Sequence, residues 1–261
     1  MPLAAVLAIS FFTQDFLTID TTPTLENYRT AATDPIYWEL LKRSLLIAGA
    51  VTVVTVGLAF PIAYFVSFGV RPERKSLWLF LITIPFWTSY LIRVFLWKVI
   101  LGFNGVINSS LLTLGVIEEP ITAILYNPTA VVITLAHAFA PFAILPIFVA
   151  LERIDRSLLE ASRDLGESRF TTFLRVTLPL AVPGIVAAAL IVFIPTVGDY
   201  ITPRLVGGPD GLMMANMIQV QFLRLNDAPL GAALSVVTMA SVTVLSLLLL
   251  LATLRWLRVR Q

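Results

Sequence analysis

The chain has 261 residues, of which 58% are hydrophobic and 13% are charged, and its mean hydropathy is +0.90. Soluble proteins carry a charge on about a quarter of their residues, so the composition excludes an ordinary soluble protein and indicates a membrane protein. Cysteine is absent, which excludes disulfides and cysteine-bound metal ions. The formal net charge of +2 does not indicate a nucleic-acid partner, and none is expected.

The first apolar segment, from Pro2 to Phe12, is too short to cross a membrane. As a helix, its eleven residues would rise about 1.5 Å each and cover little more than half of a hydrocarbon layer roughly 30 Å thick. No basic residues precede it and no convincing small-residue cleavage site follows, which disfavours a cleavable signal peptide. We interpret it as a shortened N-terminal helix, either native or left by a start site placed too far downstream.

Five longer apolar runs follow, at residues 44–70, 77–92, 130–151, 176–197 and 231–254. A helix needs about 17 to 25 apolar residues to cross the bilayer, so four runs suffice, and the second suffices if it continues past Arg93 to Leu101. Prolines in or beside the runs permit kinks: Pro61, Pro85, Pro141, Pro146, Pro179, Pro183 and Pro195. The sequence therefore predicts an all-α polytopic membrane protein with five full transmembrane helices plus the shortened N-terminal helix, as a single domain over residues 1–261.

Basic residues mark one side of the predicted spans. They gather in two loops and at the C-terminus: Arg71, Arg74, Lys75, Arg153, Arg156, Arg163, Arg169, Arg175, Arg255, Arg258 and Arg260. The loops on the other side, residues 13–39, 102–127 and 199–229, hold most of the carboxylates but just three arginines, Arg29, Arg204 and Arg224. Because loops rich in Lys and Arg stay in the cytoplasm, and with the N-terminal helix counted as the first of six spans, we expect a multi-pass protein with both termini in the cytoplasm.

The polar segment from Glu152 to Arg175 lies between two apolar runs. Asp155 suits the N-cap of a short helix, because its carboxylate can accept hydrogen bonds from the free amides of the first turn. Gly166 suits the end of that helix, since glycine reaches the left-handed conformation at low cost. Ser168 can cap a second helix that runs toward Pro179. The sequence therefore predicts a helix-turn-helix at the cytoplasmic surface, within residues 152–179.

The pattern alone leaves two interpretations of this helix-turn-helix open. One is an amphipathic loop that lies on anionic lipid headgroups. The other is a docking element, which the small residues Ala161 and Ser162 beside Glu160 favour, because they let a partner approach the helix closely.

The loop resembles the "EAA" loop of ABC importer permeases, in which Glu-Ala-Ala is followed by three residues, Gly, nine residues and Ile-x-Leu-Pro. This chain has Glu160-Ala161-Ser162, then Gly166, then Val176-Thr177-Leu178-Pro179. Both spacings match, with Ser162 in place of the second alanine and Val176 in place of isoleucine. The resemblance implies that the first helix is a coupling helix that docks into a cleft of a cytoplasmic ATPase subunit. Residues 152–179 are therefore called the coupling loop. The implied coupling residues are Glu160, Ala161, Ser162, Gly166, Leu178 and Pro179.

Further segments resemble one branch of these permeases, the spermidine/putrescine importers. They are residues 22–28, 85–93, 104–108, 151–155, 193–200 and 207–209. The sequence departs from that branch at its N-terminus, where a full first helix is usual. The resemblance therefore extends over nearly the whole chain except its first helix.

Two groups of residues are candidates for a substrate pathway. Phe86, Trp87 and Tyr90 offer aromatic faces that attract ammonium groups, with each contact worth roughly 0.5 to 2 kcal/mol. Asp199, with Tyr200 beside it, follows the apolar run at residues 176–197. A carboxylate near membrane depth is costly unless it meets a cation or lines a wet cavity. An interfacial aromatic belt and an ordinary outer-loop carboxylate stay open as alternatives.

The resemblance implies a permease subunit of an ATP-driven importer in the bacterial inner membrane, which translocates spermidine or putrescine. It implies four partners: a cytoplasmic ABC ATPase dimer, a second homologous permease, an extracytoplasmic substrate-binding protein and membrane lipid. The chain has no G-x-x-x-x-G-K-[ST] phosphate loop, so we expect no ATPase activity of its own. We expect no catalytic or metal-binding residues and no cofactor in this chain, with ATP and magnesium bound by the partner ATPase.

Two alternative functions differ in cargo or in energy source. A permease of the same superfamily for ferric iron, thiamine or an anion is the nearer one. An ion-driven secondary transporter is disfavoured, because such proteins often need several ionisable residues deep in their spans, and here His137 alone lies deep.

Overall fold

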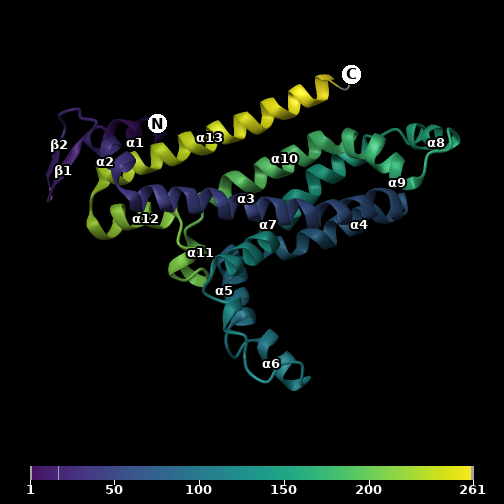
Figure 1. Cartoon of the computed structure of the whole chain (residues 1–261), viewed down its shortest axis with the longest axis horizontal. Helices are drawn as coiled ribbons and strands as arrows, with labels where there is room; N and C mark the ends of the chain where they lie inside the picture. The colour runs from purple at the N-terminus through teal and green to yellow at the C-terminus, as the bar shows by residue number, and fades with distance from the viewer. Residues whose placement is uncertain (1, 17, 260–261) are drawn as a thin grey trace. The chain divides into compact units, whose positions relative to one another are not determined.

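The computed structural model describes the backbone of residues 2–16 and 18–259, and side chains in the same ranges up to residue 256. Of the predicted cytoplasmic arginines, Arg260 and the side chain of Arg258 lie outside the described residues. The described chain is almost entirely helical (Figure 1). Five segments of it are long and apolar enough to cross a membrane: Pro35–Gly69, Tyr90–Thr113, Pro128–Glu152, Arg169–Val197 and Ala228–Trp256. The prediction of an all-α membrane protein with five full spans is confirmed.

The chain forms two compact units. Unit 1 comprises Met1–Ala50, Leu91–Leu135 and Ile194–Leu245, and unit 2 comprises Val51–Tyr90, Ala136–Phe193 and Ser246–Gln261. Long helices that pass from one unit into the other are α3 (Pro35–Tyr64), α7 (Pro128–Glu152), α10 (Leu178–Val197) and α13 (Ala228–Val259). The expected single domain over residues 1–261 stays a prediction.

Unit 1 contains the N-terminal elements and several short helices. They are α1 (Pro2–Ile9), β1 (Thr13–Asp15), β2 (Thr18–Asp20), α2 (Glu26–Thr33), α5 (Tyr90–Leu101), α6 (Val106–Thr113), the 3₁₀ turns η3 (Thr122–Ile124) and η5 (Pro209–Gly211), α11 (Ile201–Val206), α12 (Met214–Val220) and the π turn η6 (Gln221–Leu225). The shortened N-terminal helix is confirmed as α1, although it ends at Ile9. The strands β1 and β2 pair antiparallel in a small hairpin that the hydropathy pattern does not predict.

The end of α1 is attached to α2 by side chains. The amide of Asn27 donates to the carbonyl oxygens of Ser10 (3.0 Å) and Phe12 (2.6 Å). The hydroxyl of Tyr28 lies 2.7 Å from that of Ser10. These contacts tie the turn that follows α1 to α2.

The core of unit 1 includes residues from α2, the first half of α3, α12 and α13. Its buried members include Tyr37, Leu41, Met214 and Leu234. The hydroxyl of Ser44 accepts a hydrogen bond from the amide of Met214 (2.7 Å). The segment predicted as an outer loop over residues 199–229 is therefore folded into α11, η5, α12 and η6, and α12 packs into this core.

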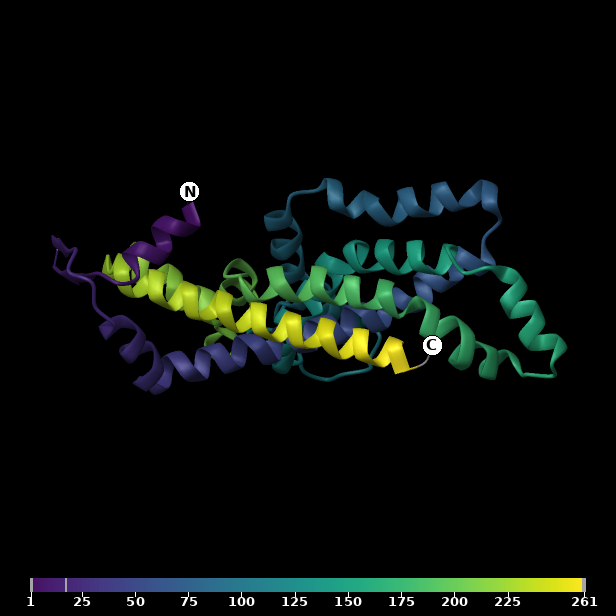
Figure 2. The ribbon, with the colours of Figure 1, turned by 90° about the horizontal axis from the view of Figure 1, so that it is seen from above.

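Unit 2 contains the shorter elements around the predicted cytoplasmic loop. They are the π turns η1 (Phe65–Gly69) and η4 (Phe173–Thr177), α4 (Pro72–Thr83), the 3₁₀ turn η2 (Ile84–Trp87), α8 (Arg156–Asp164) and α9 (Arg169–Thr172). In Figure 2, α8 and α9 lie beyond the last turn of α7 and the first turn of α10.

The prediction of one continuous helix from residue 77 to residue 101 is wrong. Helix α4 ends at Thr83, η2 follows, and α5 begins at Tyr90. Pro85 explains the break, because proline lacks the N–H that an α-helix needs and its ring clashes with the carbonyl four residues earlier. Thr88 is extended, with ψ at 149°, and its hydroxyl donates to the carbonyl oxygen of Pro85 (2.7 Å).

Helices α7 and α10 approach each other closely in unit 2 at Gly184. A Cβ atom at this position would lie 2.7 Å from the carbonyl oxygen of Pro146 and would also overlap the Cβ of Ala150. Only glycine therefore allows this contact without a shift of one helix.

We expect Gly184→Leu to lower stability, because overpacking a tight contact costs about 1 to 3 kcal/mol. The measurement is the melting temperature of the purified protein in detergent. The control is Gly57→Leu on α3, since a Cβ at Gly57 meets no atom within 4 Å. Equal melting temperatures for the two variants would show that the α7–α10 contact does not limit the stability of the protein.

Candidate functional site

The helix α8 begins as its sequence predicts. Asp155 is its N-cap, and Oδ1 of this residue accepts a hydrogen bond from the amide of Ser157 (3.0 Å). That hydrogen bond, made by the backbone amide, holds the pKa of Asp155 below its ordinary value. The carboxylate is thus charged at neutral pH and satisfies one of the free amides of the first turn.

The helix α8 ends at Asp164, and Gly166, just beyond the C-cap Leu165, has a φ of +87°. The amide of Gly166 donates to the carbonyl oxygen of Arg163 (2.9 Å), and the amide of Glu167 donates to that of Ser162 (3.2 Å). This pair of bonds is a Schellman motif, which needs a left-handed residue just after the helix. The predicted glycine turn is confirmed.

The second helix of the loop begins at Ser168 and runs into α10. The hydroxyl oxygen of Ser168 accepts a hydrogen bond from the amide of Thr171 (3.1 Å), so the predicted cap is confirmed. The π turn η4 follows, in which the amide of Leu178 donates to the carbonyl oxygen of Phe173. Pro179 accounts for this wider turn, because it has no N–H for the carbonyl of Arg175 and its ring needs room there.

Two side-chain contacts fix the angle between the helices of the loop. The hydroxyls of Ser162 on α8 and Thr172 on α9 lie 3.0 Å apart. Across the connection, Nη1 of Arg175 lies 2.6 Å from Oε1 of Glu167. The loop is therefore held in one shape by its own side chains.

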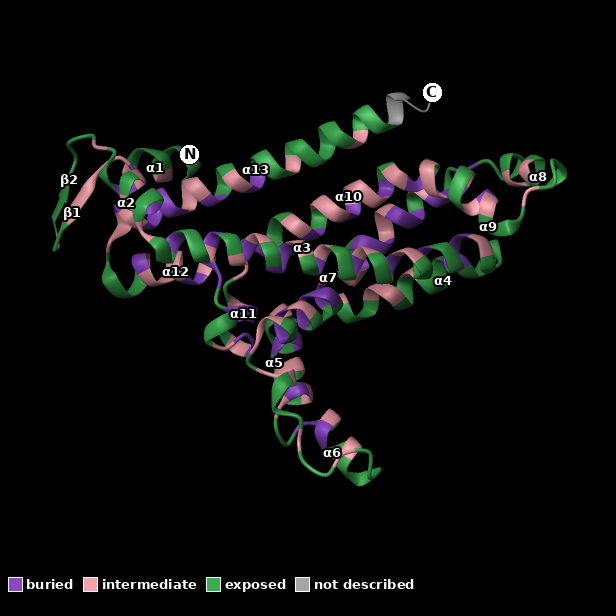
Figure 3. Cartoon of the chain, viewed as in Figure 1, coloured by how far each residue is buried: buried purple, intermediate pink, exposed green. Residues whose placement is uncertain are grey.

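The six predicted coupling residues occupy two kinds of position. Glu160, Ala161 and Gly166 are exposed, and none of the residues of α8 is buried (Figure 3). Ser162 is half-buried by its contact with Thr172, whereas Leu178 and Pro179 lie at the start of α10 and are also half-buried. The first group forms a surface that a partner can reach, and the second group joins that surface to a span. Their role in coupling stays a prediction.

Apolar side chains are also exposed on this charged loop. Leu165, which follows Asp164, is 85% exposed, and Phe170, which follows Arg169, is 70% exposed. Exposed large apolar side chains next to polar ones are typical of protein-interaction surfaces.

The five predicted pathway residues are divided between the units. Phe86 and Trp87 lie in unit 2, where the ring of Phe86 meets that of Phe142 edge to face with centroids 4.1 Å apart. Trp87 is 73% exposed and makes an edge contact with Phe80. Tyr90 is the first residue of α5. A common site with Asp199 and Tyr200, which belong to unit 1, stays a prediction.

Asp199 lies in the turn between α10 and α11. Its Oδ1 accepts hydrogen bonds from the amides of Ile201 (3.0 Å) and Thr202 (3.5 Å), so this carboxylate helps to start α11. The carbonyl oxygen of Tyr200 accepts a hydrogen bond from Asn216 (2.8 Å). The side chain of Tyr200 lines an open, mostly apolar hollow of about 640 Å³ in unit 1.

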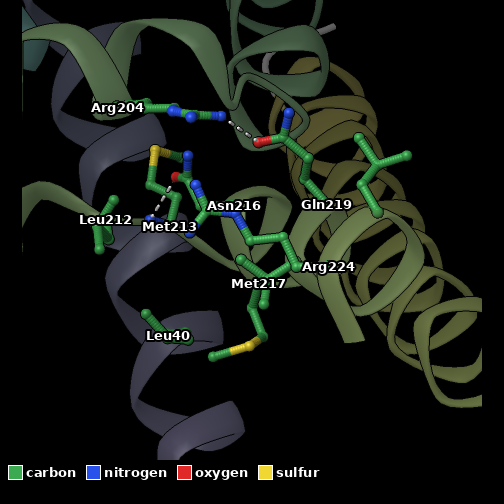
Figure 4. Close-up of a pocket in the computed structure, with 10 residues that line it drawn as sticks. Leu40, Arg204, Leu212, Met213, Asn216, Met217, Gln219 and Arg224 are labelled. Atoms are coloured by element: carbon green, nitrogen blue, oxygen red, sulfur yellow. Dashed lines mark hydrogen bonds between the residues drawn. The ribbon is translucent and has the colours of Figure 1, made fainter. Parts of the chain in front are cut away.

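A smaller pocket of about 250 Å³ lies beside α12 in unit 1 (Figure 4). Arg204 and Arg224 line it together with Gln219, whose Oε1 accepts a hydrogen bond from Nη1 of Arg204 (3.4 Å). Apolar residues, among them Leu40 and Met217, form much of the remaining wall. This pocket was not predicted from the sequence, although two of the three arginines in the predicted outer loops line it.

Comparison with known proteins gives the family. The family described as "Binding-protein-dependent transport system inner membrane component" matches residues 49–259. The spermidine/putrescine transport system permease protein PotB of Escherichia coli (strain K12) is 40% identical over 237 residues, which are 90% of this chain and 85% of that protein. The inner membrane ABC transporter permease protein YdcU of the same organism is 36% identical over 248 residues, or 90% of this chain and 78% of that protein.

Two solved structures share the fold at low sequence identity. A bacterial ABC transporter involved in the import of the acidic polysaccharide alginate has a TM-score of 0.73 at 17% identity, covering 97% of this chain and 88% of that one. The MetNI methionine ABC transporter in an inward-facing conformation has a TM-score of 0.60 at 19% identity, covering 88% of this chain and 99% of that one. The family match spans all five membrane segments except the start of the first, so the chain belongs to the binding-protein-dependent transport system inner membrane components.

Proposed function

We propose that this permease subunit serves an ATP-driven importer of polyamines, with spermidine or putrescine as cargo. The observation that carries the proposal is the 40% identity to PotB, a spermidine/putrescine permease, over 90% of the chain. The exposed aromatic face of Trp87, which is 73% exposed, supports a cationic cargo because ammonium groups are attracted to indole rings. The carboxylate of Asp199 supports it as a counter-charge.

The membrane segments and the coupling loop support a mechanism in which other subunits supply the energy. The chain is a multi-pass component of the inner membrane, and its sequence has no G-x-x-x-x-G-K-[ST] phosphate loop. ATP with magnesium would bind to a dimer of cytoplasmic ATPase subunits, and no cofactor would bind to this chain. The closing ATPase dimer would move α8, and this movement would shift the spans of this chain and of a second, homologous permease between inward-open and outward-open states.

The orientation of the chain follows from its charges. Arg71, Arg74 and Lys75 between α3 and α4 would lie in the cytoplasm, as would the arginines of the coupling loop. With the short α1 counted as a first span, both termini would then be cytoplasmic, with α12 on the outer side.

The test of the cargo is uptake into lipid vesicles that contain this chain, its second permease and the ATPase, with a binding protein outside. We expect ATP-dependent uptake of labelled putrescine or spermidine, and none without ATP or without the binding protein. Uptake of ferric iron, thiamine or an anion under the same conditions, with no uptake of either amine, would refute the polyamine assignment.

The pocket beside α12 is the proposed seat of the binding protein. Two arginines around an apolar hollow suit a carboxylate side chain of a docking protein, because Arg binds carboxylates through two parallel hydrogen bonds. Oppositely charged groups at the rim of an interface mainly speed association.

We therefore expect the double variant Arg204→Glu and Arg224→Glu to weaken binding of the loaded binding protein several-fold, mainly through slower association. The measurement is the association rate of the binding protein on immobilised nanodiscs at two salt concentrations. Arg29→Glu is the matched control, since Arg29 is exposed on α2 and does not line the pocket. Equal rates for the double variant and the control would place the seat elsewhere.

A further inference from the structure

Glu152, the last residue of α7, connects three helices of unit 2. Its Oε1 accepts hydrogen bonds from the hydroxyl of Ser67 (2.6 Å) and from Nζ of Lys75 (2.7 Å). Ser67 belongs to η1 at the end of α3 and is fully buried, and Lys75 belongs to α4 and is 9% exposed. One carboxylate oxygen at the inner end of α7 thus holds the ends of α3 and α4.

Arg156, the first residue of α8, also binds Ser67, through the backbone of that residue. Its Nη2 donates to the carbonyl oxygen of Ser67 (3.1 Å), and its guanidinium lies 5.7 Å from the ring centroid of Phe68. This carbonyl is one of the last in the helical run that ends at Gly69, and such carbonyls have no partner within their own helix. A cation is favoured at this position by the helix dipole.

These four residues, Ser67, Lys75, Glu152 and Arg156, are here called the inner linkage. The chain itself joins α8 to α7, through residues 153–155, and to α9, through residues 165–168. It does not join α8 directly to α3 or α4. Side-chain contacts therefore link a movement of α8 to the ends of α3 and α4, and the inner linkage supplies charged ones that include the buried Ser67 and Lys75.

We propose that Glu152 is a positioning residue that passes movements of the coupling helix α8, received through Arg156 and Ser67, to α4. The proposal rests on the function as an ATP-driven importer permease. The pair of Lys75 and Glu152 resists separation, because removing Glu152 leaves the buried ammonium group of Lys75 without its counter-charge. The hydroxyl of Ser67 and the guanidinium of Arg156 extend this rigid contact to the first turn of α8.

A second set of contacts keeps the fold in place when the inner linkage is removed. The ring of Phe173 in η4 packs edge to face against Phe60 and Tyr64 of α3, with centroids 5.8 Å and 5.9 Å apart. These apolar contacts do not involve Glu152. A variant without the carboxylate is therefore expected to fold, while its α4 is released from the end of α7.

The experiment follows α4 and α8 separately in the assembled complex with its ATPase and second permease. The chain has no cysteine, so single labels can be placed by Arg74→Cys on α4 and Asp164→Cys at the end of α8, both at exposed positions. The readout is the change in fluorescence of an environment-sensitive dye on adding ATP and vanadate. In Glu152→Ala we expect most of the change at α4 to be lost, while the change at α8 is kept.

Two further variants distinguish positioning from a general loss of stability. Glu152→Gln keeps the oxygen that accepts from Ser67, and it is expected to restore part of the α4 response. Glu73→Gln removes a neighbouring exposed carboxylate of α4 and is expected to leave both responses unchanged. An α4 response in Glu152→Ala equal to that of the wild type, or an equal loss at α4 and α8, would overturn the proposal.

The dye responses test the inner linkage independently of the cargo, because they need ATP but no transported amine. If both labels respond in the wild type but no amine is taken up, the polyamine assignment fails and the inner linkage is still judged by the labels. If neither label responds in the wild type, both the coupling loop and the inner linkage are refuted.

Discussion

Replacing Gly166 with valine is expected to reduce ATP-driven uptake at least about tenfold while the spans stay folded. Gly166 has a φ of +87°, and a Cβ there would meet no atom within 4 Å. The effect is therefore purely conformational: a β-branched residue is strongly disfavoured at positive φ, with a cost of roughly 1 to 2 kcal/mol. Relieving that strain would open the Schellman turn and change the angle between α8 and α9. The measurement is uptake per molecule of ATP hydrolysed in vesicles.

Two substitutions test whether the backbone conformation is the cause. Gly166→Asn is expected to keep most of the uptake, because asparagine tolerates the left-handed conformation. Gly115→Val places the same strain at a φ of +67° where a Cβ is also unobstructed, but it follows α6 and lies outside the coupling loop. Normal uptake by Gly166→Val at normal expression would contradict a coupling role for this turn.

The substitution Asp199→Asn is expected to lower the efficiency of amine uptake at least about tenfold. A hydrogen bond to a charged group is worth about 1.5 to 3 kcal/mol, and a loss of that size is about tenfold or more. Asparagine accepts hydrogen bonds from the amides of Ile201 and Thr202 as aspartate does. The substitution therefore removes the charge and keeps the start of α11. The measurement is the ratio of maximal rate to half-saturating concentration for labelled putrescine.

The control for this prediction is Asp210→Asn, which removes an exposed carboxylate of η5 in the same predicted outer segment. A general loss of negative charge on that side would lower uptake equally in both variants. Identical kinetics for Asp199→Asn and the wild type would leave Asp199 as a helix cap without a role in the pathway.

The coupling loop was predictable in detail because its structure is local. Asp155, Gly166 and Ser168 act within three or four residues of their own positions, through caps and a turn that the residue types favour. The spans were predictable because membrane length sets a simple requirement on apolar runs. No equally short-range signal places the rest of the candidate site.

The folded outer segment of residues 199–229 and the break within residues 77–101 were not predicted. The helices of residues 199–229 are held by contacts such as that between Met214 and Ser44, which lie 170 residues apart. Hydropathy gives no signal for such pairs, so the segment was predicted as a loop. Pro85 was predicted to permit a kink, but the complete break at Thr88 depends on the side-chain and backbone bonds formed there. The inner linkage likewise joins residues far apart, Ser67 and Glu152.

The π turn η4 explains why the number of residues in the coupling loop matters. A π turn contains one residue more than an α-helical turn, so everything before it is rotated by about 100° around the axis of α10. The direction in which α8 projects is thus set by the number of residues between Gly166 and Val176 as much as by their chemistry. Gaining or losing a single residue in that interval would therefore turn the exposed face of α8 in another direction, even with the caps and side-chain contacts of the loop kept.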